Sequence, residues 1–95
     1  MKMQCDRVGR QHPWHGWVVR VPHGAVVGFV TGQFDTGMHA GRLRIHRTQT
    51  DGIAVFAIPV DAVATSDNGM IILADSAASV LTEWLVYFIR RHVRA

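Results

Sequence analysis

The stretch DSAASVLTEWLVYFIRRHVR, residues 75–94, predicts one amphipathic helix around which the rest of the chain is organised. Asp75 or Ser76 can cap its N-terminus, and the arginines near its other end lie where the helix dipole is negative. A spacing of about 100° per residue places one set of apolar side chains on a single face, which we expect to pack on the core. This set is Val80, Leu81, Trp84, Leu85 and Phe88.

A second apolar group on this stretch falls on another side of the predicted helix. It consists of Val86, Ile89 and Val93, with Thr82 beside them. One layer beneath the helix cannot cover both groups. We therefore expect the second side to form the interface of a homo-oligomer, a dimer or tetramer, or to bind a protein partner. The alternative is that a loop or the N-terminal segment covers it. The apolar run over residues 84–89 is far shorter than the ~20 residues of a membrane span, so no transmembrane segment is predicted.

Length and composition fit a single globular domain over residues 1–95. A hydrophobic content of 48% with 18% charged residues excludes a disordered chain. The formal net charge of +3 rests on nine arginines and one lysine, which permits a basic surface. Cys5 is the single cysteine, so no internal disulfide can form, and the first residues lack the apolar core of a signal peptide. We expect a cytoplasmic protein.

Short strands separated by turn residues are predicted before residue 75. The clearest is residues 41–48, GRLRIHRT, in which Leu43 and Ile45 point one way and the basic residues between them point the other. The five predicted strands span residues 17–21, 25–31, 41–48, 53–58 and 70–74.

Turn signals connect these strands. Gly28 is expected to bend the second strand, residues 59–64 to turn the chain back across the sheet, and Asp67-Asn68-Gly69 to form a tight turn. The predicted class is α+β, a strongly bent five-stranded antiparallel β-sheet or barrel over residues 12–74. An irregular arm over residues 1–11 precedes it, and the long helix over residues 75–94 closes it.

Several short patterns follow one another in residues 18–74. The first patterns are Val21, the His23-Gly24 turn and the apolar-glycine step VGFV at 27–30. They are followed by Asp35, by IPVDAV at 58–63 and by GMIIL at 69–73. This order resembles the PRC-barrel domain, a small curled β-barrel of ribosome-maturation factors and of the photosynthetic reaction-centre H subunit. It otherwise suits an SH3-like barrel. The resemblance implies a non-catalytic adaptor that binds proteins, with no shared catalytic residue to carry over. The PWHGW segment at 13–17 and the C-terminal helix lie outside it.

Catalytic and metal-binding arrangements are not evident in the sequence. Five histidines lie between residues 12 and 46, but Pro13 and Gly16 disfavour a helix on which His12 and His15 would share a face. Cys5 lies in a segment that supplies no rigid base. We therefore predict a non-enzymatic protein with no catalytic residues, no metal and no cofactor.

Two other kinds of binding remain open. Arg42, Arg44 and His46 form a basic row on one strand face that could contact the phosphates of a nucleic acid. We favour a solvated strand face, because no aromatic residue alternates within the row.

A small-molecule pocket is the other alternative. Aromatic residues of the predicted helix could enclose an apolar cavity against the sheet. The candidate lining is Trp84, Tyr87, Phe88 and His39.

Overall fold

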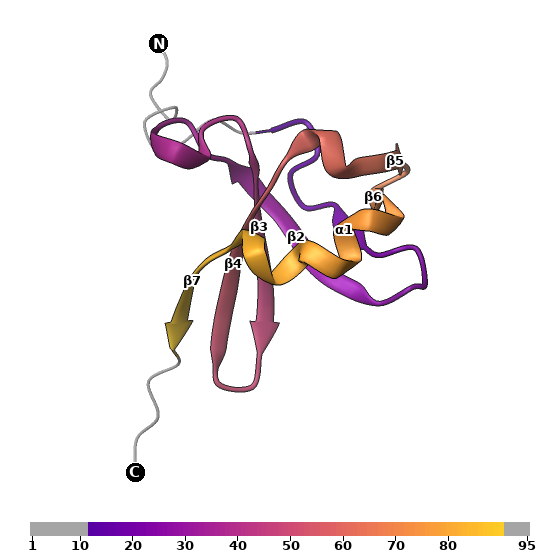
Figure 1. Cartoon of the computed structure of the whole chain (residues 1–95). Coiled ribbons are helices and arrows are strands. Elements are labelled where there is room, and N and C mark those ends of the chain that lie inside the picture. The colour runs from indigo at the N-terminus through magenta and orange to yellow at the C-terminus, as the bar shows by residue number, and fades with distance from the viewer. Residues whose placement is uncertain (1–11, 91–95) are drawn as a thin grey trace.

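The computed structural model describes residues 12–90, which build one mixed seven-stranded sheet in the order β5-β6-β1-β2-β3-β4-β7 (Figure 1). The strands are β1 (Val18–Arg20), β2 (Val26–Gln33), β3 (Leu43–Gln49), β4 (Gly52–Ile58), β5 (Val63–Asp67), β6 (Met70–Leu73) and β7 (Leu85–Arg90). The helical elements are α1 (Asp75–Val80) and the 3₁₀ turns η2 (Gly37–His39), η3 (Val60–Ala62) and η4 (Leu81–Trp84). The β1–β6 pair is parallel, and the other neighbouring pairs are antiparallel.

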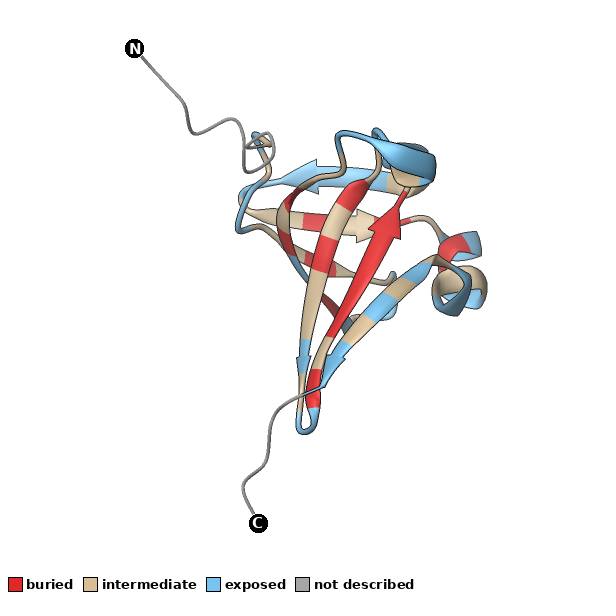
Figure 2. Cartoon of the chain, turned by 90° about the vertical axis from the view of Figure 1, so that its left-hand side faces the viewer, coloured by how far each residue is buried: buried red, intermediate tan, exposed pale blue. Residues whose placement is uncertain are grey.

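The core lies on the inner face of this curved sheet. On β3, Leu43 and Ile45 point inward opposite Ile58 and Phe56 of β4, and all four are buried. Figure 2 shows that β4 is buried almost throughout, whereas β7 alternates between exposed and partly buried residues. Ala77 of α1 is also buried against this core, so α1 and η4 cover the end of the inner face.

Strand β2 bends because its register shifts against both neighbours. Gly28 lies between these two irregularities, where a Cβ atom would meet the backbone carbonyl of His46. The glycine therefore permits the close approach of β2 to β3 at the point where the sheet curves.

The predicted helix over residues 75–94 is wrong. The α-helix ends at Val80, and Leu85–Arg90 form strand β7, antiparallel to β4. The sequence LVYFI is β-branched or aromatic at four of its five positions, and such residues lose side-chain freedom in a helix but pack well on a sheet. A strand with apolar side chains on both faces also accounts for the second apolar side that one helix could not bury.

The predicted five-stranded antiparallel barrel is wrong as well. The five predicted strand segments coincide with β1, β2, β3, β4 and β6, but β5 and β7 were missed and the β1–β6 pair is parallel. Residues 59–64 turn, as expected, through η3, and then enter β5. The tight turn at Asn68-Gly69 is confirmed, since both residues have the positive φ that a two-residue hairpin turn requires.

Candidate interaction surface and the β7 edge

The side of β2, β3, β4 and β7 that faces away from the core is here called the outer face. The register places Phe29, His46, Val55 and Tyr87 in one row across these four strands. Directly opposed residues of antiparallel strands project on the same side, so these side chains share the outer face. Phe29 and Tyr87 are 47% and 46% exposed, whereas Val55 between them is fully buried. The aromatic side chains therefore form much of the surface of this row.

The basic row predicted on β3 lies on this outer face and is held by hydrogen bonds. Arg44 donates from Nε to Thr31 Oγ1 and from Nη2 to the Thr31 carbonyl, both at 3.2 Å. Its guanidinium carbon lies 6.0 Å from the centroid of the Phe34 ring. Arg42 donates a long bond of 3.5 Å to the carbonyl of Ala57. The two bonds to Thr31 use two of the five guanidinium donors of Arg44 and fix the position of its charge.

His46 lies between Phe29 and Val55 in the outer-face row. Burial lowers the pKa of its imidazole from the ordinary value of 6.5, and the nearby Arg44 charge lowers it further. Burial also lowers the pKa of His12, and its Nδ1 accepts a hydrogen bond from the backbone N–H of Trp14 at 3.1 Å. Both histidines therefore favour the neutral form in the folded chain.

We expect the folded state to lose stability as the pH falls from 7 towards 5. Below pH ~6.5 the unfolded chain binds protons on His12 and His46 that the folded chain does not bind. The loss of unfolding free energy therefore begins near pH ~6.5 and is complete below the lowered pKa values of the folded state. Thermal melts at several pH values measure this, and the double variant His12→Gln/His46→Gln should show a shallower fall in Tm than the wild type. Equal slopes would contradict the expectation.

Charge is divided between two groups of strands and helical elements, while the loops on either side of β3 contain Asp35 and Asp51. Strands β2, β3, β4 and β7 contain arginines and a histidine but no carboxylate, namely Arg44, His46, Arg47 and Arg90. The elements η3, β5, β6, α1 and η4 contain carboxylates but no cationic residue, namely Asp61, Asp67, Asp75 and Glu83. The outer face thus belongs to the cationic half.

The two edge strands of the sheet differ in character. Strand β5, VATSD, is largely polar and exposed, which protects an edge from pairing with another chain. Strand β7, LVYFIR, is apolar over its first five residues and has no lysine or proline, and no described strand pairs with its free edge. Leu85, Tyr87 and Ile89 are each about half exposed. Only the β7 edge therefore has the apolar character of a strand suited to pairing.

The predicted oligomer interface is distributed over this region without forming one face. Ile89 projects from β7 on the outer face, while Val86 is partly buried at the register shift between β7 and β4. Thr82 is exposed in η4, and Val93 lies outside the described residues. The sequence predicted these residues on one helix face, whereas the structure places the described ones on η4 and β7.

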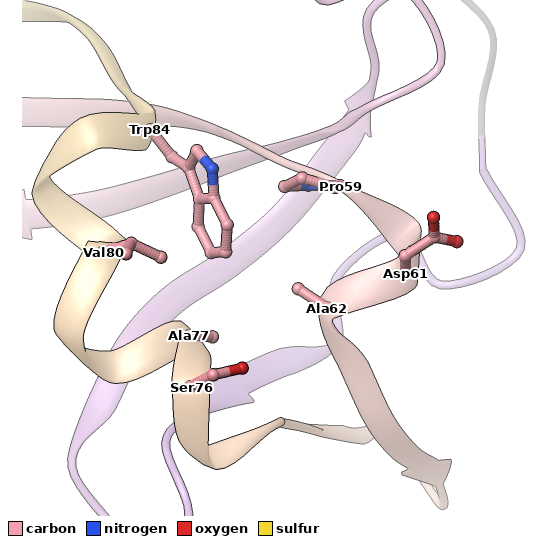
Figure 3. A pocket seen from close by; sticks show the side chains of 7 residues that line it. All are labelled: Pro59, Asp61, Ala62, Ser76, Ala77, Val80 and Trp84. Atoms are coloured by element: carbon pink, nitrogen blue, oxygen red, sulfur yellow. The ribbon is translucent and has the colours of Figure 1, made fainter.

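The structure does not bring the predicted pocket residues together. Tyr87 is on the outer face, Phe88 packs towards the core over Gly52, and His39 lies beside Phe34 with ring centroids 5.7 Å apart. Of that set, Trp84 alone lines the groove of about 380 Å³ between η3 and the α1–η4 segment (Figure 3). Its other lining residues are Pro59, Asp61, Ala62, Ser76, Ala77 and Val80.

The residues that sequence reasoning missed are Phe29 and Phe34. Phe34 follows β2, where its N–H donates to the Arg42 carbonyl, and Phe29 lies opposite His46. The aromatic residues absent from the β3 row are thus supplied by the neighbouring strand. A pairing of 25–31 with 41–48 in the correct register would have revealed them.

Within residues 12–90 no group of three or more histidine, cysteine, aspartate or glutamate side chains is arranged to hold a metal ion. In the same part of the chain no helix has the length and apolar character to cross a membrane. Comparison with protein-family models, curated proteins and solved structures finds no match for this chain. The relation to the PRC-barrel domain therefore stays a prediction.

Proposed function

We propose that this chain is a non-enzymatic interaction module that self-associates by pairing β7 with β7 of a second copy. The observation that carries the proposal is the apolar edge of β7, with which no strand within residues 12–90 pairs, in a sheet whose other edge, β5, is polar. An edge strand offers a row of unpaired backbone N–H and C=O groups, and apolar side chains beside them favour addition of another strand.

A second copy suits this edge better than an unrelated strand does. In an antiparallel pair related by a two-fold axis through Tyr87, the two Tyr87 residues lie opposite each other and Leu85 lies near Ile89 of the other copy. Aromatic and apolar pairs directly across two strands stabilise their association. The sequence of β7 is therefore complementary to itself in this orientation.

Charge supports the antiparallel orientation. Strand β7 begins directly after Glu83 and Trp84 of η4 and ends at Arg90. Antiparallel pairing brings Arg90 of one copy beside η4 of the other, so that opposite charges meet at both ends of the interface. Parallel pairing would place the two Arg90 residues together.

The interface is small. A strand of six residues buries less surface than the ~800 Å² per partner that stable complexes bury. We therefore expect a reversible dimer with a dissociation constant on the order of micromolar.

Charge reversal at the ends of β7 tests the proposal. Sedimentation velocity over a range of concentrations should show a dimer for the wild type and at least about tenfold weaker association for Glu83→Arg or Arg90→Glu, because each places like charges together. The double variant Glu83→Arg/Arg90→Glu restores opposite charges and should recover most of the affinity. Asp67→Arg on the β5 edge is the matched control and should leave association unchanged.

Two results would contradict the β7 dimer. One is a wild-type protein that stays monomeric at high micromolar concentration. The other is a double variant that associates no better than either single variant.

A further inference from the structure

Going beyond self-association, we propose that the outer face of β2, β3, β4 and β7 binds single-stranded nucleic acid. Its aromatic side chains would stack on bases, and its cationic side chains would contact the phosphates.

Aromatic side chains lie on both sides of the basic row, with Phe29 and Phe34 on the β2 side and Tyr87 on the β7 side. Phe29 lies directly opposite His46, and Phe34 pairs through its backbone with Arg42. Tyr87 lies in the same cross-strand row as Phe29, three strands away, or about 14 Å at 4.8 Å per strand. Base stacking on aromatic rings tolerates any sequence, since every base has a π face. The geometry thus provides separated stacking positions along one rigid sheet.

The charge of the face matches a phosphate backbone. Arg42 and Arg44 project between the aromatic positions, and none of the four strands contains a carboxylate. Arg44 is held by two hydrogen bonds to Thr31, so ordering its side chain on binding costs little. Arg44 belongs to the middle of the sheet, where it pairs with Gly32 of β2 and Ala57 of β4.

The small residues of the face separate its larger groups. Val55 and Ala57 project outward from β4 and are fully buried between their neighbours. The surface that a ligand meets is therefore made by rings and cationic groups, with the apolar Ile89 at one end. This composition favours a polyanion with flat bases over a second apolar sheet.

Fluorescence anisotropy with a labelled oligothymidylate of about 15 nucleotides, near the upper end of the ~4–16 nucleotides that one OB fold covers, tests the proposal. Binding should be measurable at low salt and weaken steeply as salt rises. Phe29→Ala should weaken binding by about tenfold or more through loss of one stacking position. Arg42→Gln should reduce the slope of log K against log salt by about 0.7. Val26→Ala, which removes an equally exposed apolar side chain of β2 away from the row, should bind like the wild type.

The same measurements separate the possible failures. Absence of binding at low salt overturns the proposal. Equal binding by Phe29→Ala and the wild type also overturns it, because binding through the basic terminal segments alone would not need Phe29. A Phe29→Ala variant that loses dimer formation in sedimentation would show that a second copy covers the outer face. Glu83→Arg leaves that face intact and should still bind the oligonucleotide, so failure of the β7 dimer and failure of nucleic-acid binding are distinguishable.

Discussion

Replacing Gly52 with alanine is expected to lower the free energy of unfolding by about 3 kcal/mol and to separate β7 from β4. A Cβ atom at this position would collide with the carbonyl oxygen of Ile89 and lie 2.7 Å from the Phe88 ring. The first obstacle is backbone, so no side-chain rotation removes it. Urea denaturation measures the loss, and sedimentation should show that dimer formation is lost with it under the proposed function.

Gly41→Ala is the control for the backbone strain that any substitution of a strained glycine causes. Gly41 has a φ of 87°, and a Cβ atom there meets nothing within 4 Å. Only the cost of the left-handed conformation, about 1–2 kcal/mol, is expected. Equal losses of unfolding free energy in Gly52→Ala and Gly41→Ala would mean that the close approach of β7 to Gly52 does not cause the destabilisation.

Ile45→Ala should destabilise the fold by about 2–5 kcal/mol, because it leaves a cavity in the centre of the core. Ile45 is fully buried and pairs with Phe56, whose side chain shares the inner face. Domains of this size are stable by about 5–15 kcal/mol, so this loss is a large fraction of the total. Urea or thermal unfolding followed by circular dichroism measures it.

Thr48→Ala on the same strand is the comparison for the core variant. Thr48 is exposed, and its substitution should change stability by no more than about 0.5 kcal/mol. Similar losses for the two variants would mean that β3 does not contribute Ile45 to the core as described.

The sequence predicted the strands whose periodicity is local. Leu43 and Ile45 alternate with basic residues, and this pattern located β3 within one or two residues of its observed bounds. Strand β7 was mistaken for a helix because a short run with apolar residues on both faces fits either period. The strand conformation is stabilised by pairing with the edge of β4, whose partner residues lie 29 to 38 positions earlier in the chain, from Phe56↔Leu85 to Gly52↔Arg90.

The candidate site was predicted in part for a similar reason. Arg42, Arg44 and His46 were identified because they alternate on one strand, whereas Phe29 joins them through a β2–β3 register that contains an irregularity. A shift of one residue would have placed Phe29 on the other face. Sequence spacing alone does not specify such a register.

The parallel pairing of β1 with β6 has a consequence for how the chain folds. Val18 pairs with Met70, whereas the hairpins of β2, β3 and β4 join strands close in sequence. Closing a long loop costs entropy before its contacts form, so the hairpins are expected to form early and the β1–β6 pair late. Since β1 is a strand of three residues that joins β5–β6 to the other four strands, its docking is the step that unites the acidic and cationic halves. The pairing of β1 with β6 is therefore expected to join the two parts of the sheet only after the hairpins have formed.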